Sequence, residues 1–296
     1  MDRRSSFVPS GYRGRLAPSP TGYLHIGHAR TFCTAWKRAR AAGGALVMRM
    51  EDLDRERSRA EHAEAALEDL NWLGLHWDEG PDVGGPFGPY TQSERTDIYL
   101  AAWRRLHEGG FIYPCLCSRK DMAASLGAPH ESAGRGQDAE DEPVYPGTCR
   151  TLDASACGAS GEAGPRGLNW RLRVPDGEAV EFEDGNMGRQ RFVAGIDFGD
   201  FLIWRRDGVP SYQLACVADD AAMRITEVVR GADLLKSTAR QILLNRALDL
   251  QDPQWFHCAL SVDGQGRRLA KRHDALSIRE LRRRGRKSDE VLGSAV

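Results

Sequence analysis

Two histidines three positions apart, His25 and His28, are the side chains best placed for chemistry in this sequence. On a helix, residues three apart share one face, and Gly27 between them lets a ligand approach the backbone. A helix that begins near Ile26 adds free N–H groups and the positive end of its dipole. Such a site favours a phosphate, and favours the extra charge of a phosphoryl-transfer transition state more. Taken alone, the pair also fits metal ligands or polar surface side chains.

A strand, a helix and a second strand are predicted to position this pair. Residues 14–24 indicate a strand that runs into a turn broken by prolines and Gly22. The helix is predicted from Ile26 to the glycines at 43–44, which suit a helix C-terminus. The apolar run 45–50 is typical of a buried parallel strand.

The rest of the chain continues this alternation and predicts an α/β fold with a mainly parallel sheet. Residues 58–61 fit a capping box that opens a helix reaching about Leu73. Residues 127–167 are rich in small and acidic residues, and we interpret them as a partly mobile insertion. Further helices are expected at 94–107 and 234–250, and further strands at 169–174, 181–184 and 201–206.

Composition narrows the class of protein. The chain has 296 residues, 41% hydrophobic and 28% charged, with a net charge of −1, as in an ordinary globular protein. No apolar run reaches membrane-spanning length, and the first residues do not resemble a secretory signal. Seven scattered cysteines then favour reduced thiols in the cytoplasm. The run Arg279–Lys287 is locally basic and is expected to be a solvated helix face or a contact for RNA phosphates.

The segment RLAPSPTGYLHIGHAR, residues 15–30, resembles the nucleotide-binding signature of class I aminoacyl-tRNA synthetases in its glutamyl-type version. The resemblance continues through 48–57, 211–235 and 266–275. It implies a Rossmann-like catalytic domain with ATP at the carboxyl end of the sheet, Mg²⁺ bound with the ATP, and His25, His28 and Lys271 as catalytic residues. The implied ATP contacts are His25, Gly27, His28, Arg268, Leu269 and Lys271.

The loop that carries Lys271 departs from the family pattern. A flexible ammonium suits the support of ATP phosphates as pyrophosphate leaves. Arg268 stands where the family has its first lysine and keeps the charge, whereas Ala270 lacks the usual serine hydroxyl and Arg272 replaces the last serine-type residue. We therefore expect a functional loop with altered closing kinetics.

The same resemblance implies a pocket for glutamate, which presents two carboxylates and one ammonium. Arg15 and Arg230 can each hold a carboxylate through a planar fork. Glu51 can pair with the ammonium, and Tyr212 can donate a hydroxyl. Considered one at a time, these residues are equally typical of ordinary salt bridges or of core side chains. The implied glutamate-binding residues are Arg15, Leu16, Ala17, Pro18, Ser19, Glu51, Tyr212 and Arg230.

Three cysteines indicate a possible metal site. Cys115 and Cys117 form a Cys-x-Cys pair, and Cys149 follows later. By spacing alone the three thiolates fit either an incomplete Zn²⁺ site or free thiols. The pattern resembles the zinc site of the glutamyl-Q subgroup of the family, which implies Tyr145 as the fourth ligand of one structural Zn²⁺.

Only 25 residues follow Lys271 (296 − 271), so no anticodon-binding domain is expected. The short length and the cysteine pattern resemble the glutamyl-Q subgroup. This resemblance implies that the chain activates L-glutamate with ATP without tRNA and transfers it to queuosine at the wobble position of tRNA(Asp). The alternatives are a truncated glutamyl-tRNA synthetase that charges the tRNA 3′ end and a non-catalytic paralogue that binds ATP or RNA.

A monomer is expected. The expected divisions are an extension at 1–13, catalytic segments at 14–114 and 196–275, an inserted zinc-binding subdomain at 115–195 and a basic tail at 276–296.

Overall fold

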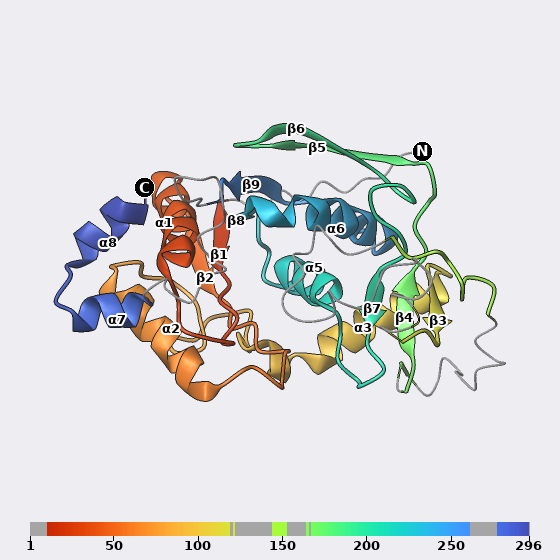
Figure 1. Ribbon diagram of the computed structural model, residues 1–296, viewed down its shortest axis with the longest axis horizontal. Helices are drawn as coiled ribbons and strands as arrows, with labels where there is room; N and C mark the ends of the chain where they lie inside the picture. Colours follow the sequence, from red (N-terminus) through yellow and green to blue (C-terminus); the bar gives the residue numbers. More distant parts are fainter. Residues whose placement is uncertain are drawn as a thin grey trace. The chain divides into compact units, whose positions relative to one another are not determined.

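The chain folds into two compact units, each assembled from segments that are distant in sequence (Figure 1). The first unit comprises Met1–Glu94, Ala222–Arg230 and Pro253–Val296, and the second unit comprises Arg95–Ala221 and Gly231–Asp252. The computed structural model describes residues 11–118, 121, 144–152, 164–165, 167–260 and 277–295. Among the helices in these ranges, none has both the length and the apolar composition needed to cross a membrane.

A strand–helix–strand motif opens the first unit. Strand β1 (Arg13–Leu16) pairs in parallel with β2 (Ala45–Met48), with Arg15 opposite Val47. Helix α1 (Ile26–Ala41) forms the crossover between them, as two parallel strands require. The inner faces of the strands are fully buried. The expected strands and the expected start of the helix are confirmed.

Glycines end α1, as the sequence predicts. Gly43 has φ +60°, a left-handed conformation that side chains with a Cβ disfavour. The Gly44 N–H then donates to the Ala39 carbonyl oxygen at 2.9 Å. The chain can therefore reverse within two residues and enter β2.

Helix α2 (Ala60–Trp72) ends near the expected Leu73, but the predicted capping box is wrong. The N-cap residue is Arg59, whose side chain makes no capping bond. The Arg59 N–H donates to the Pro20 carbonyl oxygen at 3.0 Å, which places the start of the helix after Arg59. Ser58 therefore precedes the N-cap, and its buried hydroxyl has no hydrogen-bond partner among the described residues.

The carboxyl-terminal helices complete the core of the first unit. Helix α7 (Ile278–Arg283) packs on α2, and α8 (Ser288–Ala295) packs on α1. Ile278, Leu281 and Val291 join the buried cluster around Leu24. The remaining elements of this unit are a short 3₁₀ helix (Gln92–Glu94) and two neighbouring strands, β8 (Glu227–Gly231) and β9 (Gln254–Cys258).

The second unit is antiparallel where it is sheet, so the expectation of a mainly parallel sheet is wrong there. Strands β5 and β6 are joined by a tight turn in which Asp184 Oδ1 accepts hydrogen bonds from the Asn186 and Met187 N–H groups. A connection this short can join only antiparallel strands. A second sheet has the order β3-β4-β7 and is antiparallel throughout. The strands are β3 (Ile112–Cys115), β4 (Asn169–Leu172), β5 (Ala179–Asp184), β6 (Gly188–Val193) and β7 (Leu202–Trp204).

A buried ion pair joins two helices of the second unit, α3 (Thr96–Glu108) and α5 (Tyr212–Ala222). Arg95 Nε and Asp219 Oδ1 lie 2.6 Å apart, and both side chains are fully buried. The Tyr99 hydroxyl donates to the other Asp219 oxygen at 2.9 Å. Removing one partner of such a pair leaves an uncompensated charge, which costs several kcal/mol. The second unit also contains α6 (Leu235–Ala247), with a 3₁₀ turn (Ala232–Leu234) before it.

Candidate nucleotide and metal sites

The two histidines form a stacked pair at the start of α1. Their ring centroids lie 3.7 Å apart with an angle of 25° between the planes. His25 is the N-cap residue, and its Nδ1 accepts a hydrogen bond from the Gly27 N–H at 3.1 Å. His28 Nδ1 accepts one from the His25 N–H at 3.3 Å. The rings therefore satisfy two backbone donors at the helix N-terminus, in a reciprocal capping arrangement.

These bonds determine where each ring carries its proton. An Nδ1 atom that accepts a hydrogen bond has no proton, so each neutral ring is protonated on Nε2. Burial lowers the pKa of His25, and burial followed by the charge of His25 lowers the pKa of His28 to about 3. Although His28 is an exposed residue, both rings are neutral at neutral pH. The helix start thus offers two Nε2–H donors.

Gly27 makes room for this pair. A Cβ at position 27 would lie 3.0 Å from His25 Cε1 and 3.1 Å from its Nδ1. The sequence suggested that Gly27 gives a ligand access to the backbone. The structure adds a second reason for glycine, because a Cβ there would be in tight contact with the His25 ring and would require the ring to shift.

The chain returns to this site immediately before α7. Ser277 forms an isolated bridge with His25, and the Ile278 N–H donates to the Leu24 carbonyl oxygen at 2.7 Å. In sequence, Ser277 follows Lys271 by six positions. Arg268, Leu269 and Lys271 themselves lie outside the described residues.

The residues expected to hold glutamate from the first unit cluster around the ends of β1 and β2. The Arg49 N–H donates to the Leu16 carbonyl oxygen at 2.9 Å, and the Glu51 N–H donates to that of Pro18 at 3.0 Å. The Ala17–Ser19 segment therefore runs beside the segment that carries Glu51. Pro18 is buried, Ala17 is half-buried and Ser19 is exposed.

The two arginines of the expected pocket are both buried, and Arg15 contacts the strand that carries Arg230. Arg15 Nη1 donates to the Val229 carbonyl oxygen at 2.8 Å, next in sequence to Arg230. Arg230 Nε donates to His257 Nε2 at 3.2 Å, and its guanidinium lies 5.2 Å from the centre of the Trp255 ring. Only 4% of Arg15 and 5% of Arg230 are exposed, so both cations have fixed positions.

Glu51 lies beside a fully buried arginine. Arg49 Nη2 and Glu51 Oε1 are 2.8 Å apart, as expected for residues two apart on the same face of an extended chain. Tyr212, the remaining expected pocket residue, is the first residue of α5 in the second unit and is 39% exposed.

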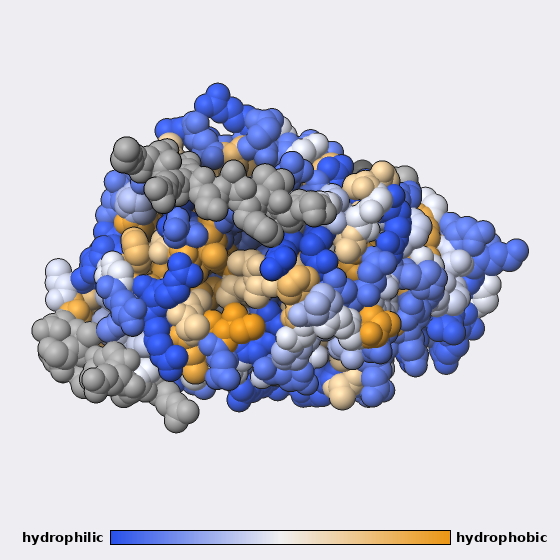
Figure 2. Space-filling view, turned by 180° about the vertical axis from the view of Figure 1, so that it is seen from behind, coloured by the Kyte–Doolittle hydropathy of each residue, from blue (hydrophilic) through white to orange (hydrophobic). Residues whose placement is uncertain are grey.

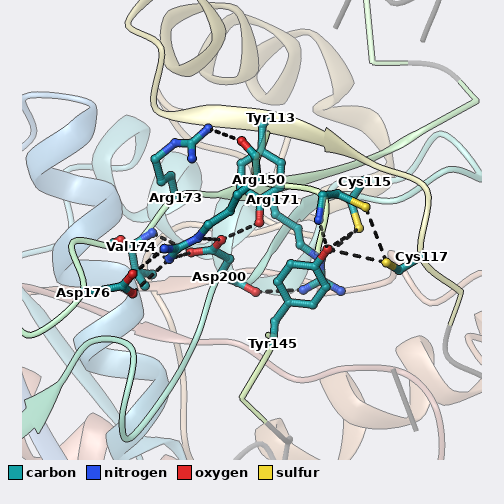
Figure 3. Close-up of polar contacts among 11 residues, drawn as sticks. Tyr113, Cys115, Cys117, Tyr145, Arg150, Arg171, Arg173, Val174, Asp176 and Asp200 are labelled. Carbon is teal, nitrogen blue, oxygen red and sulfur yellow. Dashed lines mark hydrogen bonds and ion pairs between the residues drawn. The ribbon is translucent and has the colours of Figure 1, made fainter. Parts of the chain in front are cut away.

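The predicted metal ligands come together in the second unit (Figure 3). The sulfurs of Cys115, Cys117 and Cys149 all lie within 4.8 Å of one another. The Tyr145 hydroxyl lies 3.5 Å from both Cys115 Sγ and Cys117 Sγ, and Cys117 Sγ lies 3.5 Å from Cys149 Sγ. Around a tetrahedral Zn²⁺ with Zn–S bonds of about 2.3 Å, neighbouring sulfurs are about 3.8 Å apart. The four donors therefore fit Zn²⁺ in chemistry and spacing.

Two of the cysteines and the tyrosine have shifted pKa values. Burial raises the pKa of Cys117 to about 11, and burial together with hydrogen bonds to the cysteines raises the pKa of Tyr145. For Cys149, burial opposes ionisation, but bonds from Tyr145, the Leu116 backbone and the other thiols lower its pKa. Zn²⁺ binds thiolates and releases protons, so the lowered pKa of Cys149 favours its binding to a cation.

Arg171 contacts the cluster directly, and Arg150 fixes the chain beside Cys149 (Figure 3). Arg171 Nε donates to Cys115 Sγ at 3.3 Å, and its guanidinium lies 4.0 Å from the centre of the Tyr145 ring. Arg150, next to Cys149, donates to Asp200 at 2.5 and 2.6 Å. Groups that orient metal ligands in this way commonly change metal affinity by about 10- to 100-fold.

Sequence reasoning missed three of these supporting residues, His257, Arg171 and Arg49. Arg49 was open to detection, because it lies beside a recognised strand, two positions from Glu51. Arg171 was not, because it reaches Cys115 only through the pairing of β3 with β4. His257 was not, since nothing local in the sequence brings β9 beside β8. The other described cysteines, Cys33, Cys216 and Cys258, are buried, and Cys157 lies outside the described residues.

Comparisons with known proteins identify the family of this chain. Residues 12–292 match the family model described as tRNA synthetases class I (E and Q), catalytic domain. A glutamyl-Q tRNA(Asp) synthetase of Symbiobacterium thermophilum is 50% identical over 95% of this chain and 84% of its own length. Another protein of that name, from Nitratidesulfovibrio vulgaris, is 48% identical over the same shares.

A solved structure agrees in fold. A glutamate tRNA ligase from Elizabethkingia meningosepticum, crystallised with its amino acid, superposes with a TM-score of 0.75 at 27% sequence identity. The alignment covers 93% of this chain and 53% of the ligase. This chain therefore spans about half the length of that solved protein.

Proposed function

The chain belongs to the class I tRNA synthetases for glutamate and glutamine, and from this membership we propose that it joins L-glutamate to queuosine at the wobble position of tRNA(Asp). In the first step the glutamate α-carboxylate attacks the α-phosphorus of ATP, and glutamyl-adenylate forms as pyrophosphate leaves. In the second step a hydroxyl of the modified base attacks the activated carbonyl, and AMP leaves. The first step requires no tRNA.

The stacked His25–His28 pair is the observation that carries this proposal. Neutral rings with two Nε2–H donors at a helix N-terminus match the phosphate oxygens of ATP, and bind them more strongly as charge develops. Ser277 bridges to His25 only six positions after Lys271. This anchoring supports a role for Arg268, Leu269 and Lys271 at the same triphosphate. Magnesium would accompany ATP, where it shields the departing pyrophosphate.

Selection of glutamate is assigned to the two buried arginines. Arg15 and Arg230 would hold the carboxylates, Glu51 the ammonium, and Tyr212 would add a neutral hydroxyl donor. Leu16, Ala17, Pro18 and Ser19 would shape the wall beside them. A pocket with fixed cations discriminates against glutamine, which presents no second carboxylate and leaves a buried charge unpaired.

His257 is expected to position Arg230 for this task. In a His257→Leu variant the Arg230 Nε loses its acceptor, so we expect the KM for glutamate to rise about 10-fold while the KM for ATP stays unchanged. His257→Gln, whose side-chain oxygen can accept the same bond, should restore most of the affinity. Both constants come from ATP–pyrophosphate exchange. Equal KM values for glutamate in the two variants would show that the His257 acceptor does not position Arg230.

One Zn²⁺ is proposed for the second unit, bound by Cys115, Cys117, Cys149 and Tyr145. Its role would be structural, since the four protein ligands close the coordination sphere. We further propose that it organises an inserted subdomain at 115–195 between the catalytic segments 14–114 and 196–275. Because its acceptor is a tRNA, the reaction is proposed to take place in the cytoplasm. The enzyme is proposed to act as a monomer.

An exchange assay with a panel of amino acids tests the first step directly. Without tRNA, we expect ATP–pyrophosphate exchange with glutamate and little with glutamine or aspartate. Absence of exchange would favour a non-catalytic protein that binds ATP or RNA.

The second step is tested by mapping labelled glutamate on purified tRNA(Asp) and tRNA(Glu) after nuclease digestion. We expect label only in the anticodon fragment of queuosine-containing tRNA(Asp). Label on the 3′-terminal adenosine of tRNA(Glu) would instead identify a truncated glutamyl-tRNA synthetase.

A further inference from the structure

We propose that Arg49 is a positioning residue for substrate recognition, which holds the Glu51 carboxylate in place for the ammonium group of glutamate. The inference rests on the proposed function, which assigns that ammonium to Glu51. It gives a task to a buried cation that neither carboxylate of the substrate requires.

The interior is an unusual place for the charge of Arg49. The face of the molecule in Figure 2 is largely hydrophilic, because charged side chains normally stay in water. Arg49, by contrast, is 0% exposed, and Glu51 is 8% exposed. A buried ion pair is often no more stable than apolar residues of similar volume, because both charges lose their hydration. Stability alone therefore does not account for this pair.

Two nitrogen atoms of Arg49 converge on one oxygen of Glu51. Nη2 donates to Oε1 at 2.8 Å, and Nε donates to the same atom at 3.3 Å. The backbone on both sides is fixed as well, since the Arg49 and Glu51 N–H groups donate to the carbonyl oxygens of Leu16 and Pro18. The Glu51 carboxylate is therefore already ordered, and an ammonium that binds to it has less side-chain freedom to remove.

The strand register places this pair on the same face as Arg15. Arg15 lies opposite Val47 in the parallel pair of β1 and β2. Side chains two positions apart on an extended chain point to the same face, and the backbone hydrogen bonds of Arg49 and Glu51 continue the extended pairing beyond β2. Arg49 and Glu51 therefore follow Val47 on the face that carries Arg15.

The charges of the expected pocket can be matched to those of glutamate one by one. Among the described residues of the first unit, the buried arginines are Arg15, Arg49 and Arg230. The two carboxylates of glutamate are assigned to Arg15 and Arg230, and its ammonium is assigned to Glu51. Arg49 is the cation that remains, and its contacts show that it acts on Glu51.

The test compares glutamate with glutarate, the same dicarboxylate without its amino group, as an inhibitor of ATP–pyrophosphate exchange. Arg49→Met removes the charge at similar length, and we expect the KM for glutamate to rise about 10-fold, the usual effect of losing a hydrogen bond to a charged group. The KM for ATP and the inhibition constant of glutarate should stay at their parental values. Arg49→Lys keeps the charge and should recover part of the loss.

Further variants separate this role from a general effect on the fold. Arg13→Met breaks a similar ion pair, with Glu79 at 2.8 Å, at the start of β1 and should keep the parental KM for glutamate. Glu51→Gln should raise that KM, and adding Arg49→Met to it should change little more, because both residues act through one contact. Thermal unfolding shows which variants fold. If Arg49→Met does not, Arg49→Lys gives the same comparison of glutamate with glutarate.

Each outcome decides the proposal. An equal loss of affinity for glutamate and glutarate overturns it, because Arg49 would then act on the carboxylates or on the pocket as a whole. A parental KM for glutamate in the folded Arg49 variants overturns it too. If the parent itself shows no exchange, the proposed function fails and the role of Arg49 fails with it. That result is visible in the parent alone, before any variant is compared.

Discussion

Replacing His28 with alanine is expected to lower the rate of glutamate-dependent ATP–pyrophosphate exchange by about 100- to 1000-fold, the usual effect of removing one donor that stabilises a transition state. The KM for ATP should change little, because the bond strengthens mainly as charge develops. The variant also loses the acceptor for the His25 N–H, so thermal unfolding must be measured alongside.

Two matched variants separate catalysis from capping. His28→Asn keeps a short side-chain acceptor near the Nδ1 position but lacks the Nε2–H, whereas His28→Gln can reach the Nε2 position with an N–H donor. We expect the asparagine variant to be nearly as slow as alanine and the glutamine variant to be faster. Lys271→Ala should slow exchange substantially for the same electrostatic reason, and a parental rate there would remove Lys271 from the mechanism.

The pH dependence provides a further check on the neutral rings. Because the pKa values of His25 and His28 lie below the ordinary value of about 6.5, exchange should not show a histidine ionisation near that pH. In the unfolded chain both rings take up protons near pH 6.5. The contribution of these rings to stability is therefore complete above that pH and is lost as the pH falls below it, for His28 toward about 3. A clear ionisation near 6.5, absent in His28→Gln, would show that His28 titrates normally.

Loss of one ligand from the cysteine cluster should have the second large effect. The parent, purified without a metal-binding tag, is expected to contain about one zinc per chain, and Cys117→Ala should contain almost none. The apparent melting temperature should fall by several degrees, because metal binding contributes directly to folding free energy. Elemental analysis and thermal unfolding with and without a chelator give both results.

Tyr145→Phe tests the fourth ligand separately from packing. It keeps the buried ring but removes the hydroxyl, so zinc should bind at least 10-fold more weakly, as measured by competition with a chelator. Cys33→Ala, at a buried cysteine of the other unit, should keep its zinc and control for loss of a core thiol. A zinc content near zero in the parent would retire the metal site.

Local features were the ones that the sequence predicted well. The helix after His25 and its end at Gly43 follow from residue types whose backbone preferences act within one turn. Strand β2 was recognisable as a short apolar run beside those breakers. The Cys115–Cys117 pair indicated metal chemistry, although Tyr145 entered only through resemblance to a family, since a tyrosine thirty positions away carries no local signal.

Features that depend on pairing between distant segments were not predicted from the sequence. Strand β6 reads GRQRFV, which is too polar to resemble a buried strand, and it forms because Asp184 and Gly188 turn the chain back on β5. The predicted capping box was wrong because the N–H of the actual N-cap residue, Arg59, donates to the carbonyl oxygen of Pro20, which is distant in sequence. In the same way, the His257–Arg230 bond depends on two strands becoming neighbours.

The cysteine cluster has a consequence for how this protein can vary. Cys117 and Cys149 lie 3.5 Å apart at their sulfurs, with 31 residues between them in the sequence (149 − 117 − 1). Once the ends of such a stretch are tied, doubling its length costs only about 0.6 kcal/mol in closure entropy. Evolution, or a protein engineer, can therefore graft segments of very different size at this point while the catalytic strands keep their register.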